Sequence, residues 1–316
     1  MPGRRAERVP LEMLPAGEHV SVLLDTVLEW LRPCAGGRYI DATLGNGGHA
    51  GAILDASGPD GRLLGLDADP DAVAVARDRL AEYGERATIV NGNFDQLAAV
   101  VEAEQFGPAD GILMDLGISS RQLDAGGRGF SFRRDEPLDM RFDPTHGESA
   151  AALLGRADEG EIADILFQFG EEYRSRRVAR AIVRARERSP ISTTVDLVAV
   201  VESALGPKRG RVHPATKSFQ ALRIAVNDEL GVLERTLPAA AGMLAPGGRL
   251  AVISFHSLED RRVKQFFRSG GTEEAPLAEL TRKPLVPTLE ESERNPRARS
   301  AKLRVAERIA AGGTPS

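Results

Sequence analysis

DATLGNGGH, residues 41–49, lies between a predicted strand at Tyr39–Ala42 and a predicted helix at Ala50–Ala56. Three of its residues are glycines, which turn tightly and let the backbone approach a ligand because they have no Cβ. A helix that starts near Gly48 directs its first free N–H groups toward whatever is bound there. The junction therefore predicts a binding site for a nucleotide-type cofactor.

The identity of the cofactor depends on the acidic residues around this junction. Asp67 closes a second apolar run, and an acidic residue in that position usually binds the ribose hydroxyls of a nucleotide. GNGGHA, residues 45–50, fits only the looser form of the dinucleotide fingerprint. Asp41 would repel a pyrophosphate but attract a sulfonium or an ammonium group. The pattern favours S-adenosylmethionine over NAD, with a purely structural turn as a third interpretation.

Length and composition indicate a soluble globular protein of more than one lobe. The chain has 316 residues, of which 42% are hydrophobic and 28% are charged. It has no apolar run long enough to span a membrane, and its arginine-containing N-terminus has no apolar stretch that would make a secretory signal. The single cysteine, Cys34, cannot form an intrachain disulfide. We therefore expect a cytoplasmic protein without a membrane partner.

The net charge is −5, but the basic residues are clustered. Such clusters neutralise phosphates locally while the whole chain stays acidic, although each one alone is also explained by a solvated helix face. Three clusters together favour a nucleic-acid partner. They comprise seven arginines between Arg174 and Arg188, then Lys208, Arg209 and Arg211, and finally Arg294, Arg297, Arg299, Lys302 and Arg304.

Strands and helices alternate through the first third of the chain, which predicts an α/β fold with a doubly wound, mostly parallel sheet. Ligands of such sheets bind beyond the carboxyl ends of the strands, so Asp41, Asp67, Phe94 and Asp115 should converge on one crevice. The predicted strands are Tyr39–Ala42, Arg62–Leu66, Thr88–Val90 and Gly111–Asp115, and the predicted helices are His19–Leu31, Ala50–Ala56, Pro70–Ala81 and Gln96–Glu104.

The alternation stops after Leu116, and Ala150–Ala204 is predicted to be largely helical. We expect the segment 123–216 to form an inserted helical lobe, and 1–122 and 217–316 to form the cofactor-binding domain. The alternation resumes with Ala221–Asn227, predicted to open a helix, and with a fifth strand at Gly248–Ser254.

Several long stretches resemble the bacterial 16S ribosomal RNA cytosine-N4 methyltransferase family, from His19 to about Glu307. The matching segments are HVSVLL at 19–24, DATLGNGGH at 41–49, DLGISSRQLD at 115–124, GFSF at 129–132, LDMR at 138–141, QALRIAVN at 220–227, SFHSLEDR at 254–261 and NPRARSAKLR at 295–304. The resemblance implies a class I, Rossmann-like methyltransferase that uses S-adenosylmethionine and methylates a decoding-centre cytidine of the small ribosomal subunit. It also implies that the inserted lobe binds the RNA substrate.

The same resemblance implies which residues hold the cofactor. These positions are Gly47, Gly48, His49, Asp67, Phe94, Asp115 and Gln122. Each also has a structural interpretation, as a turn glycine, a helix start, a strand-end cap or a core aromatic.

The proton acceptor for methylation of an amine is left open, with Asp115 and His256 as candidates. The aromatic partner of the target base is equally open among Phe130, Phe132 and Phe255. No metal site is expected, since the five histidines are scattered and no cysteine pair exists. The oligomeric state is undetermined, with a homodimer as one option. An NAD-dependent oxidoreductase and a non-catalytic RNA-binding assembly factor are the alternatives from other functional classes.

Overall fold

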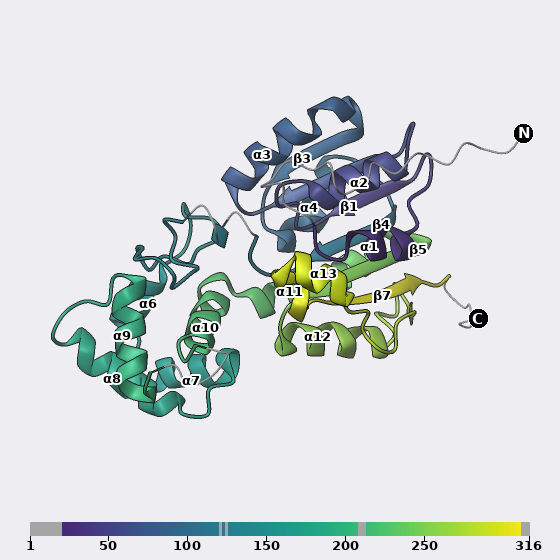
Figure 1. Ribbon diagram of the computed structural model, residues 1–316. Coiled ribbons are helices and arrows are strands. Elements are labelled where there is room, and N and C mark those ends of the chain that lie inside the picture. The colour runs from purple at the N-terminus through teal and green to yellow at the C-terminus, as the bar shows by residue number, and fades with distance from the viewer. Residues whose placement is uncertain (1–20, 120–121, 124–125, 208–212, 311–316) are drawn as a thin grey trace, which may run out of the picture.

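The computed structural model describes residues 21–119, 122–123, 126–207 and 213–310 (Figure 1). His19, the N-terminal arginines, the basic residues 208–211 and the segment 312–316 lie outside the described residues. The strands are β1 (Arg38–Asp41), β2 (Arg62–Asp67), β3 (Ala87–Asn91), β4 (Ala109–Asp115), β5 (Leu244–Ser254), β6 (Leu277–Glu279) and β7 (Lys302–Arg308).

The helices fall into two groups, one around the sheet and one in the lobe. Around the sheet lie α1 (Leu24–Leu31), α2 (Gly48–Ala56), α3 (Pro70–Leu80), α4 (Leu97–Ala103), α11 (Glu229–Met243), α12 (Ser257–Arg268) and α13 (Leu289–Arg294). The lobe contains α6 (Ala150–Arg156), α7 (Glu159–Gly170), α8 (Ser175–Arg186), α9 (Thr194–Leu205) and α10 (Thr216–Asn227). Short 3₁₀ turns lie at Ala81–Arg86, Phe94–Gln96 and Pro296–Ser300.

The seven strands form one sheet in the order β3-β2-β1-β4-β5-β7-β6. The pairs from β3 to β5 are parallel, and β7 is antiparallel to both β5 and β6. The strand order reverses beside β1, so the carboxyl ends of β1 and β4 border a crevice at the topological switch point. The predicted doubly wound, mostly parallel sheet is confirmed.

Alternate residues of the strands supply two separate cores, as expected for a sheet that is covered on both faces. Tyr39 and Leu113 pack on the side of α1, α2 and α3. Ile40 and Ile112 pack on the opposite side with residues of α4, α11 and α12. The middle of each of these strands is thus apolar, and an aspartate follows at the carboxyl end of each.

The first helix is shorter than predicted. It begins at Leu24 and not at His19, because Leu23 adopts a left-handed conformation with φ 55° and its N–H donates to the Glu291 carboxylate at 2.6 Å. The described residues 21–23 therefore form a turn. That hydrogen bond joins positions far apart in the chain, which local periodicity does not reveal.

The lobe has a core of its own, which runs from Phe130 to Leu222 and includes Phe219 on α10. Ala221–Asn227 therefore ends a helix and does not open one, which corrects the prediction. The helix stops because Asp228 adopts a left-handed conformation with φ 47°, and α11 begins at the next residue. In Figure 1, α10 leads from the lobe back toward α11 and the sheet.

The fifth strand also starts earlier than predicted. Ala109 pairs with Leu244 and Gly111 with Arg249, so β5 bulges between these pairs. Gly247 in the bulge has φ 83°, a conformation that favours glycine. The predicted turn at 246–248 thus survives as a bulge inside the strand.

Candidate functional site

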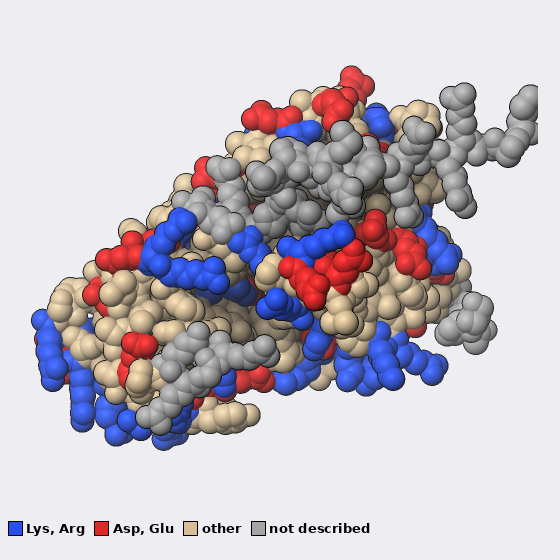
Figure 2. All heavy atoms as spheres, in the orientation of Figure 1, with Lys and Arg blue, Asp and Glu red and all other residues tan. Residues whose placement is uncertain are grey.

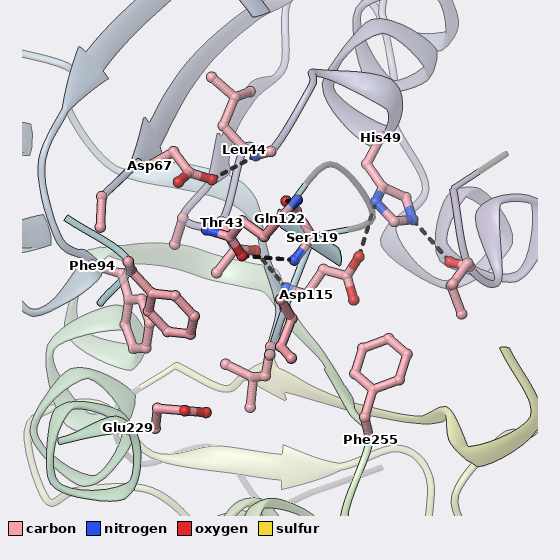
Figure 3. A pocket seen from close by; sticks show the side chains of 18 of the residues that line it. Thr43, Leu44, His49, Asp67, Phe94, Asp115, Ser119, Gln122, Glu229 and Phe255 are labelled. Carbon is pink, nitrogen blue, oxygen red and sulfur yellow. Dashed lines mark hydrogen bonds and ion pairs between the residues drawn. The ribbon is translucent and has the colours of Figure 1, made fainter. Parts of the chain in front are cut away.

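A pocket opens at the carboxyl ends of β1, β2 and β4, on the side where the lobe joins the sheet (Figure 3). Its walls come from the glycine-rich turn, from the loops after β2, β3 and β4, and from the first residues of α11 and α12. The residues that face it include Thr43, Gly45, Gly48, His49, Asp67, Phe94, Asp115, Ser119, Gln122, Phe142, Asn227, Glu229, Phe255, Glu259 and Arg297.

The two predicted glycines have different roles. Gly48 lines the pocket, and a Cβ added there would lie 2.1 Å from the Ser21 Oγ. Gly47 does not line the pocket. It precedes α2 with φ 78°, and an added Cβ would lie 3.2 Å from Leu80. The missing Cβ of Gly48 therefore permits the close approach of Ser21, whereas Gly47 permits the turn itself.

Asp67 ends β2 and holds the glycine-rich turn. Its two oxygens accept the N–H groups of Gly45 at 2.7 Å and Asp69 at 2.9 Å. Burial raises the pKa of Asp67 to about 6, and the two N–H groups oppose that rise. Each oxygen keeps a lone pair for a ligand hydroxyl.

Asp115 extends from the end of β4 into the pocket between His49 and Phe255 (Figure 3). Its backbone N–H donates to the Thr43 hydroxyl at 2.6 Å. The carboxylate is far less well satisfied, because Oδ1 has no hydrogen-bond partner among the described residues. Burial, then the charges of Asp41 and Glu259, raise the pKa of Asp115 well above its usual value.

His49 supplies neither a hydrogen bond nor a positive charge to the carboxylate of Asp115. Its Nε2 lies 2.9 Å from the carbonyl oxygen of Val22, so Nε2 carries the proton and donates. The other nitrogen, Nδ1, is 3.7 Å from Asp115 Oδ2, beyond hydrogen-bond distance. Burial lowers the pKa of His49 to about 4, so the ring is neutral at physiological pH.

Asp41 lies behind the pocket and does not line it. It is 1% exposed, one oxygen accepts the Thr43 N–H at 3.2 Å, and Oδ2 has no partner among the described residues. Burial, together with the charge of Asp67, raises the pKa of Asp41 to about 7. Asp41, Asp67 and Asp115 therefore form a group of carboxylates whose pKa values are all raised by burial.

Gln122 joins the loop after β4 to the loop after β2. Its Oε1 accepts the Ser119 N–H at 3.0 Å and its Nε2 donates to Asp69 Oδ2, also at 3.0 Å. Arg128 from the lobe binds the same Asp69 oxygen. Gln122 therefore stands at the pocket wall in a network that connects the lobe to the sheet.

Two of the three aromatic residues predicted to contact the base lie away from the pocket. Phe130 is buried beside Phe142, and Phe132 packs in the lobe on His213, at 4.8 Å between ring centroids. Phe255 does line the pocket, as does Phe94 after β3. Phe142, which the sequence did not single out, also reaches it, because Asn227 Oδ1 accepts the Phe142 N–H at 2.8 Å.

His256 is the N-terminal cap of α12 and is not among the residues that line the pocket. Its Nδ1 accepts the Glu259 N–H at 3.4 Å, and its Nε2 lies 3.1 Å from Glu259 Oε1. Ligand atoms of Glu229, His256 and Glu259 come within 4.8 Å of one another. Glu229, however, already binds Arg223 through two hydrogen bonds of 2.7 and 2.8 Å.

The pocket fits a positively charged cofactor better than an anionic one. A pyrophosphate would be repelled by the carboxylates of Asp67 and Asp115, whereas a cation would be attracted by them. A glycine-rich turn after β1, an acidic end of β2 and antiparallel β7 beside β5 complete the arrangement. Fold and site together define a class I methyltransferase that uses S-adenosylmethionine.

Comparison with known proteins agrees with this class. The family model described as the MraW methylase family matches residues 16–309. A protein of Thermomicrobium roseum named "Ribosomal RNA small subunit methyltransferase H" is 51% identical, over 97% of this chain and 98% of its own. Proteins with the same name from Heliobacterium mobile and Geotalea uraniireducens are 50% and 49% identical, each over 92% of this chain and at least 98% of their own. The chain belongs to the MraW methylase family.

Proposed function

We propose that this protein transfers a methyl group from S-adenosylmethionine to the exocyclic N4 of a decoding-centre cytidine in 16S ribosomal RNA. The names of its relatives support ribosomal RNA of the small subunit as the substrate. The resemblance of its motifs supports N4 as the acceptor atom. A ribosomal substrate supports a cytoplasmic location. In the part of the chain that the structure describes, no helix is long and apolar enough to cross a membrane.

The residues around the glycine-rich turn would hold the cofactor. Gly48 leaves room for close approach, Asp67 offers lone pairs to the two ribose hydroxyls, and Phe94 offers an aromatic face to adenine. His49 flanks the methionine end, and Gln122 closes the wall next to the lobe. When bound, S-adenosylmethionine supplies an electrophilic methyl group on a cationic sulfur.

The partnerless carboxylate of Asp115 is the observation that carries the proposed chemistry. A cytosine amine is a weak nucleophile because its lone pair is delocalised into the ring, so the protein must orient it and accept its proton during attack. Asp115 lines the pocket with about a quarter of its side chain exposed, its Oδ1 has no partner among the described residues, and Phe255 stands beside it as a surface for the base. Of the two candidate acceptors we assign the role to Asp115, because His256 caps α12 and does not face the pocket.

The lobe is proposed to bind the RNA. Its core joins α6 to α10, and its first described residues connect to the pocket through Gln122 and Arg128. Lys and Arg side chains gather over the α8 end of the lobe in Figure 2. This division assigns 123–216, extended through α10, to the substrate and the remaining chain to the cofactor.

Transfer of radiolabel from S-adenosylmethionine to small ribosomal subunits that lack the modification tests the proposal. We expect label in 16S ribosomal RNA with the wild-type protein and none with Asp67→Ala, while the variant keeps its affinity for RNA. Retained cofactor binding without label in RNA would contradict the proposed substrate. Label transfer that persists unchanged in Asp67→Ala would contradict the assigned cofactor site.

A further inference from the structure

Two aromatic side chains are exposed side by side at the end of α7 and in the turn that follows it. Phe167 is 53% exposed and Tyr173 is 84% exposed. Their ring centroids are 6.4 Å apart and their planes meet at 71°. Isolated exposed apolar residues are ordinary, but a contacting aromatic pair of this exposure offers a continuous surface to a ligand.

A cation lies over one ring of the pair. Lys217 Nζ lies 5.5 Å from the Tyr173 ring centroid and donates to the Glu171 carbonyl at 2.8 Å. Exposed arginines follow directly along the chain, beginning with Arg174 and continuing on α8 with Arg176, Arg177, Arg180 and Arg184. Aromatic faces next to clustered positive charge are the features with which proteins bind unpaired nucleotides.

The turn that carries Tyr173 also contacts α12, next to the wall of the methyl-transfer pocket. Glu171 accepts the Ser257 hydroxyl at 2.8 Å and lies 3.5 Å from the Arg261 guanidinium. Ser257 is the first residue of α12, two positions after Phe255 of the pocket wall. A nucleotide on the aromatic pair would therefore lie at the junction of lobe and sheet, close to the nucleotide inside the pocket.

We propose that Phe167, Tyr173 and Lys217 form a stacking platform for an unpaired nucleotide that flanks the target cytidine in the RNA. The inference rests on the proposed function, because it takes RNA as the substrate. The platform binds a base through the aromatic faces and its phosphate through Lys217 and the neighbouring arginines. It holds the strand while the target base occupies the pocket, so it affects RNA binding and leaves the methyl transfer itself unchanged.

The test compares Tyr173→Ala and the double variant Phe167→Ala/Tyr173→Ala with the wild type. Because removal of one stacking side chain weakens nucleotide binding roughly five- to 150-fold, we expect the KM for small subunits to rise by about that factor. The kcat at saturating RNA and the Kd for S-adenosylmethionine should stay the same. Tyr173→Phe should keep the wild-type KM, whereas Tyr173→Leu, which has no aromatic ring, should raise it as Tyr173→Ala does.

A direct readout uses an RNA oligonucleotide with 2-aminopurine beside the target cytidine. Stacking should quench its fluorescence with wild-type protein and with Tyr173→Phe, but not with Tyr173→Ala. Val195→Ala, which truncates a half-exposed apolar side chain on α9 of the same lobe, serves as the matched control and should change neither KM nor quenching.

The outcomes separate the two proposals. If the wild type labels RNA but the double variant keeps its KM and its quenching, the platform is wrong and the proposed function stands. If the double variant keeps its KM but loses self-association in sedimentation, the pair is a contact between two copies and the platform is again wrong. If the wild type labels no RNA at all, the proposed function itself is overturned.

Discussion

Substitution of Asp115 by asparagine separates the charge of this side chain from its size. The side chain is about a quarter exposed, its Oδ1 has no partner among the described residues, and its pKa is raised by burial and by neighbouring carboxylates. We expect Asp115→Asn to weaken the binding of S-adenosylmethionine but to leave the binding of S-adenosylhomocysteine, whose sulfur is neutral, within about twofold.

The expected magnitude follows from two opposing terms. Two unit charges about 4 Å apart at an effective dielectric constant of about 20 attract each other by ~4 kcal/mol. Part of this is offset, because burial raises the pKa of Asp115, so that ionising its carboxyl group for a bound cation costs free energy. A net loss of about 1–3 kcal/mol remains, which corresponds to a five- to 150-fold weaker Kd.

Isothermal titration calorimetry in buffers of different ionisation enthalpy measures both quantities. The wild type should release protons when it binds S-adenosylmethionine, and its affinity should rise with pH, because the carboxylate form binds the cation. Asp115→Asn should lose most of that proton release. Equal losses of affinity for S-adenosylmethionine and S-adenosylhomocysteine would refute the reasoning, since the sulfonium charge would then not be what Asp115 recognises.

Three further substitutions test the electrostatics and packing of the site. Because its pKa is raised to about 7, Asp41 stabilises the folded state below pH ~4 and loses that contribution as the pH rises through 7. Relative to the wild type, Asp41→Asn should therefore gain about 1–3 kcal/mol in the free energy of unfolding between pH 5 and pH 8, measured with urea and without cofactor. A gain that does not depend on pH would contradict this. Arg223→Leu leaves Glu229 buried and unpaired and should cost about 3–5 kcal/mol, most of which Arg223→Leu/Glu229→Leu should restore in the same assay. Gly48→Ala places a Cβ 2.1 Å from the Ser21 hydroxyl and should weaken cofactor binding by about 1–3 kcal/mol; if Ser21→Ala fails to restore affinity in the double variant, that contact is not the cause.

Local signals in the sequence predicted the fold and several of the residues that line the pocket. Asp67 and Asp115 each end a strand, so the topology alone brings them to one edge of the sheet. Gly48 lies in a turn whose glycines are contiguous in the sequence. These features require no knowledge of contacts between distant segments.

Other parts of the pocket wall depend on contacts between distant segments. Phe142 reaches the pocket because Asn227 at the end of α10 holds its backbone, and Glu229 is fixed there by Arg223. His256 was predicted as a candidate proton acceptor because it is titratable, but in the structure it is the N-terminal cap of α12. No periodicity or spacing in the sequence predicts the position of Phe142 in the pocket or the capping role of His256.

The identity of the methylated nucleoside tests the central claim most directly. Small subunits that lack the modification would be incubated with the protein and S-adenosylmethionine, and their 16S ribosomal RNA digested and analysed by mass spectrometry. We expect N4-methylcytidine at a single site, and its formation should depend on Asp115. 5-Methylcytidine, or a methyl group on any other base, would contradict the proposed function, in which an exocyclic amine and not a ring carbon lies beside the carboxylate of Asp115.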